Sequence, residues 1–415
     1  MNSWAMRHRV RVQGNGTLGQ VSSSSPNLSY GPSIVAIPGP SIVPPRVLEA
    51  MARPLPDIYE GELIDVSDEV FATLPGLVGT AGEAFVAISN GHGGWEMALT
   101  NTLSKGDRVL VADCGLFALV WADMARGLGL DVELLRAAEG RAVNPAAIEA
   151  RLAADAEHTI KAVLLTHVDT ATSIRNDLPA IRSALDAAGH PALLMVDSIA
   201  SIGCETYRMD EWGIDVTISA SQKGLMTPPG LGLVWVGERA WAAHADAGLR
   251  TPYWDWTPRR NPEANYLRFC GTPPVSHLFA LREALALIAE EGIENVWARH
   301  AALADAVRAA VAAWSTSDGL ALWASEPSER ANSVTTIRTG SIDAGLLRKT
   351  TRHEYGVTLG VGLRAFADAS FRIGHMGHVS AGSLLGVLGV IESALHRIGA
   401  PIGASGVAAA AAALA

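Results

Sequence analysis

Residues 162–196, AVLLTHVDTATSIRNDLPAIRSALDAAGHPALLMV, decide the fold, because two apolar runs flank one amphipathic stretch. The runs at 162–166 and 192–196 are short and almost continuously apolar, which is typical of strands that are buried on both faces. The stretch at 178–188 has the apolar spacing of a helix. Strand, helix and strand in this order predict a parallel sheet with helices on both faces.

The same alternation continues on both sides of this unit. Helical patterns near 94–103, 119–124 and 145–153 alternate with further apolar strand patterns at 85–89, 108–111, 131–135, 216–219 and 231–236. Seven strands with their helices predict an α/β fold with a mostly parallel seven-stranded sheet. Because such sheets bind ligands beyond the carboxyl ends of their strands, the functional residues are expected there.

The rest of the chain predicts a second, smaller domain and two tails. Helical periodicity over 278–313 and mixed strand and helix signals over 333–398 indicate a smaller α+β C-terminal domain. The expected division is a disordered tail over 1–30, a large domain with an N-terminal segment over 31–290, the small domain over 291–398 and an Ala-rich tail over 399–415. This last segment has too little to bury and is expected to lie outside the fold.

The composition favours a globular protein with a small-molecule ligand. Of the 415 residues, 49% are hydrophobic and 18% are charged, which supplies enough apolar material for a core. The formal net charge of −10 argues against nucleic acid or an anionic membrane as the main partner. The three cysteines are Cys114, Cys204 and Cys270, and they lack disulfide or metal-ligand spacing. A reducing cytoplasm therefore fits best, and no metal is expected. Residues 1–30 are Ser-rich, with three Arg and no acidic residue, which leaves a transit peptide open beside a disordered tail.

Two polar residues that follow apolar strands are candidates for catalysis. Asp197 ends the run 192–196, and a buried carboxylate must be hydrogen-bonded or ion-paired, so it is either a helix cap or the partner of a cationic ligand atom. Lys223 follows the strand 216–219 in Ser-Ala-Ser-Gln-Lys-Gly, 219–224. A single lysine is by default a surface residue, but a partly desolvated lysine at a strand end is a Schiff-base candidate, because burial lowers its pKa.

Two further patterns suit the binding of anions. Ser-Asn-Gly-His-Gly-Gly at 89–94 joins a strand to a helix, so its backbone N–H groups can approach a phosphate, although such a turn is often only a tight connection. Arg372 lies in Phe-Arg-Ile-Gly-His-Met-Gly at 371–377. Its guanidinium suits either the bidentate capture of a carboxylate or a structural ion pair.

These residues carry a resemblance to the class V aminotransferases of the fold type I pyridoxal-phosphate enzymes, in particular to the serine–glyoxylate and alanine–glyoxylate branch. The resemblance runs from about residue 37 to 398, and its motifs are GHGGWE at 91–96, NTLSKGD at 101–107, THVDTAT at 166–172, RMDEWGID at 208–215, SQKGLM at 221–226 and RIGH at 372–375. It implies pyridoxal 5′-phosphate as the cofactor and a homodimer with shared active sites. Lys223 would form the Schiff base and shuttle the proton, and Asp197 would pair with the pyridine nitrogen.

The resemblance implies binding roles for further residues. Cofactor contacts are expected for a set in which Phe117 stacks on the ring and Thr170 bonds its hydroxyl: Gly91, His92, Gly93, Phe117, Thr170, Ile199, Ser221 and Gln222. Thr272 would reach the phosphate of the neighbouring subunit. Arg372 would hold the substrate carboxylate, with Gly39 and Tyr59 as further substrate-binding residues.

Departures from the family pattern leave the substrate open. Glyoxylate-specific relatives show Asp-His-Arg-Ser where this chain has Asp-Ile-Tyr-Glu-Gly at 57–61, and their usual Glu is Asp169 here. The expected reaction is transamination between a small L-amino acid, such as serine or alanine, and glyoxylate or pyruvate. The chain also resembles pyridoxamine–pyruvate aminotransferase, whose substrate is the vitamer itself. A lyase or desulfurase is a weaker alternative, because no cysteine has a Gly/Ser-rich flank, and a non-enzymatic regulator would need an extra recognition domain or a lost lysine.

Overall fold

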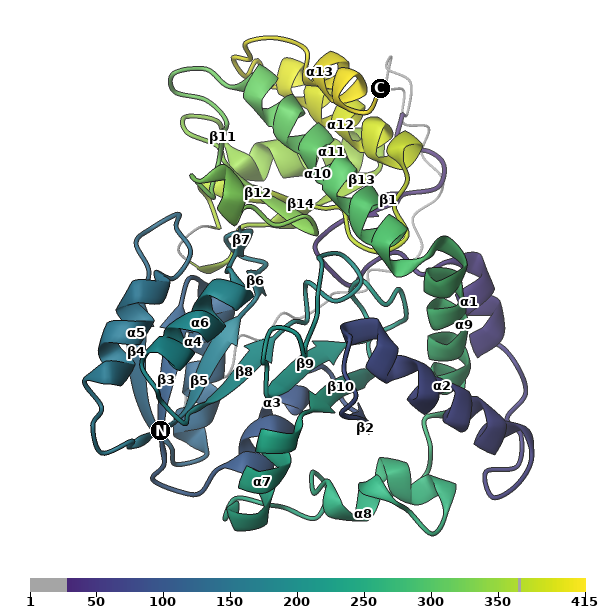
Figure 1. Ribbon diagram of the computed structural model, residues 1–415. Helices are drawn as coiled ribbons and strands as arrows, with labels where there is room; N and C mark the ends of the chain where they lie inside the picture. Colours follow the sequence, from purple (N-terminus) through teal and green to yellow (C-terminus); the bar gives the residue numbers. More distant parts are fainter. Residues whose placement is uncertain (1–27, 365–366) are drawn as a thin grey trace, which may run out of the picture.

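The computed structural model describes residues 28–364 and 367–415 and contains two sheets with a short hairpin between them (Figure 1). The expected N-terminal tail lies outside the described residues up to position 27. Among the described residues, no helix is both long enough and apolar enough to cross a membrane.

The larger sheet has seven strands, as predicted. Their order across the sheet is β2 (Glu83–Ile88), β10 (Leu231–Val236), β9 (Val216–Ala220), β8 (Leu193–Asp197), β5 (Ile160–Thr166), β3 (Arg108–Asp113) and β4 (Asp131–Arg136). β10 runs antiparallel to both of its neighbours, and the other pairs are parallel. The predicted α/β fold with a mostly parallel sheet is confirmed.

Helices cover both faces of this sheet. Successive side chains of a strand point to opposite faces, so Leu164 and Leu165 of β5 enter two different core clusters. One cluster includes α3 (Gly91–Thr102), α4 (Leu116–Gly127) and α7 (Glu238–Asp246). The other includes α2 (Glu62–Val78), α5 (Pro145–Ala153), α6 (Leu178–Ala187) and α9 (Val275–Glu291). Burial on both faces explains why the strands read as continuous apolar runs.

The smaller sheet has five strands and packs against the C-terminal helices (Figure 1). Its order is β1 (Ile34–Ala36), β13 (Val357–Val361), β14 (Ser370–Gly374), β12 (Val334–Arg338) and β11 (Ala321–Leu322). The helices are α10 (Ile293–Trp314), α11 (Ala344–Tyr355) and α12 (Ala381–Arg397). The expected division assigned residues 34–36 to the large domain, whereas β1 pairs in parallel with β13 of the small sheet. The helical stretch 278–313 is two helices, because Gly292 at φ 84° separates α9 from α10.

A hairpin of β6 (Val168–Asp169) and β7 (Ile174–Arg175) lies between the two sheets (Figure 1). Ala331 N donates to Ser173 O at 3.0 Å, and Ile174 forms a β-bridge with Arg330. The hairpin therefore docks the small sheet onto the carboxyl edge of the large one. The remaining short elements are α1 (Pro45–Met51), α8 (Thr257–Arg260), η1 (Asn265–Phe269) and η2 (Pro327–Glu329).

The Ala-rich end of the chain is part of the fold, contrary to the expectation. It forms α13 (Gly406–Ala413), whose N-cap Ser405 accepts a hydrogen bond from Ala408 N. A Cβ at Gly406 would lie 2.4 Å from the Trp314 ring, so the missing side chain allows close approach to α10. The expectation that this segment has too little to bury is wrong, because its small residues let the helix approach α10 closely and pack against it.

Candidate active site

A cavity opens at the carboxyl edge of the large sheet, where the sequence predicted it. It is lined by side chains from α3, α4, the hairpin and the loops after β8 and β9: Gly91, His92, Trp95, Phe117, Val168, Thr170, Asp197, Ile199, Ala200, Gln222 and Lys223. Most of the predicted cofactor residues are in this set. Trp95, Val168 and Ala200 had no predicted role, although Trp95 lies one helical turn after Gly91 and its spacing would have indicated it.

Asp197 is the last residue of β8 and is 3% exposed. Its Oδ1 accepts a hydrogen bond from Ile199 N at 2.9 Å. Burial, together with the neighbouring charge of Asp169, raises the pKa of Asp197 from its usual 3.8 to about 7, although Lys223 opposes this rise. One backbone donor does not offset the burial of a carboxylate, so a cation in the cavity is needed to stabilise the anion.

Lys223 lies in the loop between β9 and β10, and Ser221 holds that loop in shape. Ser221 Oγ donates to Pro228 O at 2.8 Å, and Ser221 O accepts from Thr227 N at 3.1 Å. Ser221 therefore supports the loop, and it is not among the residues that line the cavity. Burial and then the nearby Arg372 charge lower the pKa of Lys223 to about 8. A neutral amine is thus accessible near neutral pH, as a nucleophilic lysine requires.

The N-terminal segment crosses over this lysine. Lys223 Nζ donates to Pro38 O, and Ser41 Oγ donates to Lys223 O at 2.7 Å. Gly39 has φ 95°, and a Cβ built there would lie 2.4 Å from Lys223 Nζ. Gly39, predicted as a substrate residue, is thus brought against the lysine amine, and only glycine leaves space for it.

The N-terminus of α3 forms one end of the cavity. Asn90 caps the helix by accepting from His92 N at 3.0 Å, and a Cβ at Gly91 would lie 2.1 Å from Ile199 Cδ1. The His92 ring lies 4.5 Å from the Trp95 ring, and burial lowers the pKa of His92. Gln222 Oε1 is buried and has no hydrogen-bond partner among the described residues. The N–H groups of a helix N-terminus suit a phosphate, and the Gln222 amide can add a donor by presenting its NH2 group to the anion. A Cβ at Gly93 would meet Ser89, so Gly93 faces away from the cavity.

Phe117 and Thr170 line the cavity, and Asp169 bonds to the backbone of Phe117 and of Ala171, which follows Thr170. Asp169 Oδ2 accepts from Phe117 N at 2.7 Å, and its Oδ1 accepts from Ala171 N at 2.9 Å. A Cβ at Gly115 would lie 2.3 Å from Asp169 Cγ, so the carboxylate occupies the space of a missing side chain. The sequence marked Asp169 only as a departure from the family. The structure shows that it caps α4 in place of the absent side chain of Gly115.

Arg372 lies on β14 and reaches the hairpin. Its Nε donates to Val361 O at 2.7 Å, and its Nη1 donates to Thr170 O at 2.8 Å. Burial lowers the pKa of Arg372 to about 10, with Asp169 opposing this shift. None of the ion pairs found over 28–364 and 367–415 includes Arg372, so the structural ion pair that the sequence left open is not seen there. The remaining guanidinium N–H groups are available for a carboxylate.

Besides Ser221 and Gly93, two further predicted site residues do not line the cavity of this chain. Tyr59 is 71% exposed, and its ring contacts Tyr266 at 6.1 Å between centroids. Thr272 is exposed in the loop between η1 and α9. Their predicted roles remain predictions. Conversely, Pro38 had no signal in the sequence, because it contacts Lys223 across 185 residues of chain.

The residues present fit pyridoxal phosphate. Asp197 needs a cation, which a pyridinium nitrogen would supply, and the N–H groups at the start of α3 suit a phosphate. Lys223 offers an amine of lowered pKa beside them. Fold and site together define a pyridoxal-phosphate-dependent enzyme of fold type I.

Comparison with known proteins gives the family. The family model for class V aminotransferases matches residues 78–380. The chain is 42% identical to a serine–glyoxylate aminotransferase of Methylorubrum extorquens, over 90% of this chain and 94% of that one. It is 40% identical to an L-aspartate–glyoxylate aminotransferase of Paracoccus denitrificans, over 91% and 94%. The crystal structure of pyridoxamine–pyruvate aminotransferase from Mesorhizobium loti superposes with a TM-score of 0.84 at 28% identity, covering 92% of this chain and 97% of that one. The chain belongs to the class V aminotransferases and is an aminotransferase.

Proposed function

We propose that the protein moves the amino group of a small L-amino acid, such as serine or alanine, onto glyoxylate or pyruvate, with pyridoxal 5′-phosphate as cofactor. The observation that carries this proposal is the position of Arg372. Its guanidinium is buried without an ion-pair partner among the described residues and is bonded to the backbone of Thr170, a residue of the cofactor cavity. A ligand carboxylate held there lies beside the cofactor. The named glyoxylate aminotransferases among the relatives support the choice of acceptor.

The roles of the residues follow from their positions. The bound cofactor supplies an electron sink for the bond that is broken at the substrate Cα. Asp197 would hold the pyridine nitrogen and keep it protonated. Lys223 Nζ would act first as general base and then as general acid, carrying one proton between the substrate Cα and C4′ of the cofactor. Phe117 would pack against the ring, and Arg372 would keep the carboxylate of donor and acceptor in the same place.

Chemistry at cysteine is less well supported. Cys114 and Cys204 are buried, and burial raises the pKa of Cys204 to about 12 and that of Cys114 further still. Both thiols are therefore protonated, and a desulfurase nucleophile must be a thiolate. Cys270 is exposed and donates to Pro252 O at 3.4 Å, away from the residues that line the cavity.

We also propose a cytoplasmic homodimer. Tyr59 and Thr272 are exposed and do not line the cavity of their own chain, and we propose that both complete the site of a second copy. Light scattering on the purified protein tests this proposal. A monomer at micromolar concentration would remove both residues from the site.

The reaction is tested by a screen of donors and acceptors. Purified protein is incubated with serine, alanine or aspartate and with glyoxylate or pyruvate, and the new amino acid is quantified. We expect turnover with at least one of these pairs, dependent on added pyridoxal phosphate. Activity only with pyridoxamine and pyruvate, in a colourless protein indifferent to the cofactor, would instead assign the vitamer reaction that the Mesorhizobium loti structure represents.

A further inference from the structure

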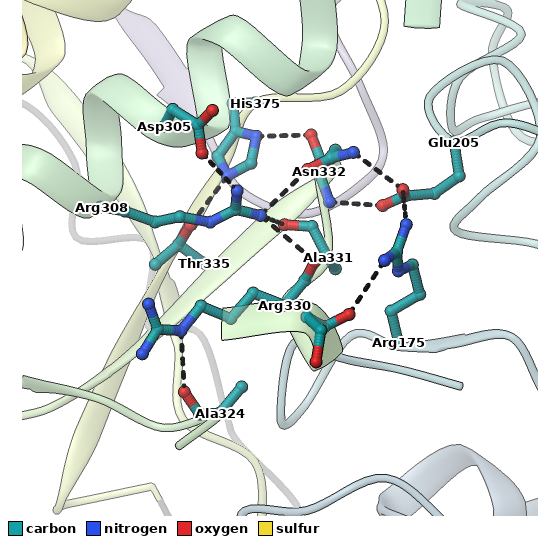
Figure 2. Close-up of polar contacts among 11 residues, drawn as sticks. Arg175, Glu205, Asp305, Arg308, Ala324, Arg330, Ala331, Asn332, Thr335 and His375 are labelled. Carbon is teal, nitrogen blue, oxygen red and sulfur yellow. Dashed lines mark hydrogen bonds and ion pairs between the residues drawn. The ribbon is translucent and has the colours of Figure 1, made fainter. Parts of the chain in front are cut away.

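A buried polar cluster joins the segment after Asp197 to the small sheet (Figure 2). Its centre is Glu205, which follows Asp197 by eight residues and is 1% exposed. Glu205 Oε1 accepts from Asn332 N, and Oε2 accepts from Asn332 Nδ2 at 3.0 Å. Arg175 Nη1 lies 3.6 Å from Oε2. Both carboxylate oxygens of Glu205 therefore accept hydrogen bonds from Asn332, which precedes β12 of the small sheet. Oε2 also forms an ion pair with Arg175 of the hairpin.

Asn332 is fixed from a second side by His375. Asn332 O contacts His375 Nδ1 at 2.9 Å, and His375 N donates to Ser333 O at 3.0 Å. His375 Nε2 contacts Thr335 Oγ1 at 2.9 Å, as Figure 2 shows. Asn332 leads into β12, and His375 follows β14 directly. Through Asn332, the contacts of Glu205 therefore reach the end of the pair at which β12 begins and β14 ends.

The same two strands present Arg372. In the β12–β14 ladder Thr336 lies opposite Arg372. Arg372 precedes His375 by three residues along the chain. Any displacement of Asn332 and His375 shifts the backbone that carries the guanidinium. The distance between Arg372 and the Lys223 amine on the large sheet depends on how this ladder is docked.

Stability alone does not account for Glu205. Burial raises its pKa to about 7, even though Arg175 and the Asn332 N–H lower it. A buried carboxylate with these partners contributes little net stability, whereas buried polar groups can specify one geometry. The small sheet has further docking contacts that need no charge, such as Thr336 Oγ1 donating to Ala171 O at 3.1 Å.

We propose that Glu205 is a positioning residue for the substrate carboxylate, because by holding Asn332 it fixes the end of the β12–β14 ladder from which Arg372 reaches the cavity. This inference rests on the proposed function, since the carboxylate is that of the amino acid or the oxo acid. Glu205 does not touch the substrate and acts only through the placement of Arg372.

The first test is Glu205→Gln in the cofactor-loaded enzyme. The amide oxygen still accepts from Asn332 N, but the amide NH2 then faces Asn332 Nδ2, donor against donor. Calorimetry with glycolate, an unreactive hydroxy acid, measures carboxylate capture without turnover. We expect the Kd for glycolate and the KM for donor and acceptor to rise together by about tenfold, a difference of about 1.4 kcal/mol. We expect kcat and the resting absorbance to change less than about twofold, because Lys223 and Asp197 are untouched.

A swap and a matched control make the test specific. Glu205→Gln combined with Asn332→Asp exchanges amide and carboxylate, so the hydrogen bond between the two side chains is restored, and Arg308 Nη2 still has an acceptor at position 332. The swap should recover wild-type Kd and KM. The control is Glu329→Gln: Glu329 also joins the two sheets, through Arg141 and Ala142 N, but makes no contact with Asn332. It should leave both constants unchanged.

The outcomes separate this inference from the proposed function. Three results would each overturn the positioning role. They are a Kd for glycolate in Glu205→Gln equal to that of wild type, an effect on kcat instead of KM, and a folded swap variant that recovers neither Kd nor KM. If the single variant does not fold, the swap alone decides, since it must fold and bind as wild type does. A wild type that transaminates no donor refutes the proposed function, while the glycolate measurement still compares the variants. A wild type that binds no glycolate refutes the inference as well.

Discussion

Asp197→Asn should stabilise the protein at alkaline pH while it abolishes activity. The variant keeps an oxygen that can accept from Ile199 N, but it removes the buried negative charge. Burial raises the pKa of Asp197 from 3.8 to about 7 in the protein's own field. At about 1.4 kcal/mol per pKa unit, ionised Asp197 destabilises the cofactor-free fold by roughly 4 kcal/mol.

The pH dependence of this effect has a definite sign. Because the folded pKa lies above the unfolded one, the folded state binds more protons between pH 3.8 and about 7, and wild-type stability falls as pH rises through this window. At pH 8 the whole penalty is present, whereas at pH 5 the folded carboxyl is mostly protonated and only about 2 kcal/mol remains. The advantage of the asparagine variant should therefore grow by about 2–3 kcal/mol between pH 5 and pH 8.

Urea unfolding of the cofactor-free proteins at pH 5 and pH 8 measures this difference, since the titrating groups that do not interact with Asp197 cancel between wild type and variant. With the cofactor bound, the order should reverse, because the pyridinium compensates the wild-type carboxylate and the variant loses both that pairing and turnover. If the cofactor-free variant is less stable than wild type at pH 8, or transaminates normally, Asp197 is a structural cap and its catalytic role is wrong.

Three further changes test the remaining parts of the site. Lys223→Ala removes the proton carrier, so kcat should fall at least ~10³-fold while the protein still binds cofactor, and near-normal turnover would exclude the lysine. Arg372→Lys replaces a planar fork by a point charge. We expect kcat/KM for donor and acceptor alike to fall by roughly 30- to 5,000-fold, a loss of about 2–5 kcal/mol, with an unchanged resting absorbance. Equal kcat/KM values in variant and wild type would remove Arg372 from the site. Gly39→Ala places a Cβ 2.4 Å from Lys223 Nζ at φ 95°, so the amine must leave Pro38 O. Attachment of the cofactor, followed by absorbance in stopped flow, should therefore slow by ~10-fold or more. An unchanged rate would show that the close fit of Gly39 has no function.

The parts of the site that the sequence predicted are those with a local signal. Asp197 and Lys223 each follow a buried apolar strand, and a parallel sheet places such strand ends at one edge. The start of α3 was visible for the same reason, because small residues between a strand and a helix indicate a close approach of the backbone. The fold class followed from the period of the apolar pattern alone.

The parts that the sequence did not predict depend on contacts between distant segments. Pro38 meets Lys223 across 185 residues, and Glu205 meets Asn332 across 127 residues. Neither pair has a pattern that identifies it before the chain is folded. The edge strand β1 was not predicted, and its residues were placed with the large domain, because three residues carry no information about their partner strand. Thr272 has a further limit, since its predicted role concerns a second subunit.

The buried charges of the site lower the stability of the fold, and the same charges suit the binding of a pyridinium and a carboxylate. Burial raises the pKa of Asp197 and lowers those of Lys223 and Arg372, so each of the three groups is driven toward its neutral form. A pyridinium at Asp197 and a carboxylate at Arg372 would each reverse the corresponding penalty, whereas a neutral ligand would reverse neither. For Lys223 the shift is itself useful, since the neutral amine is the reactive form. Selection for a stable fold alone would remove these buried charges, and their combination therefore indicates a site that binds a cation and a carboxylate side by side.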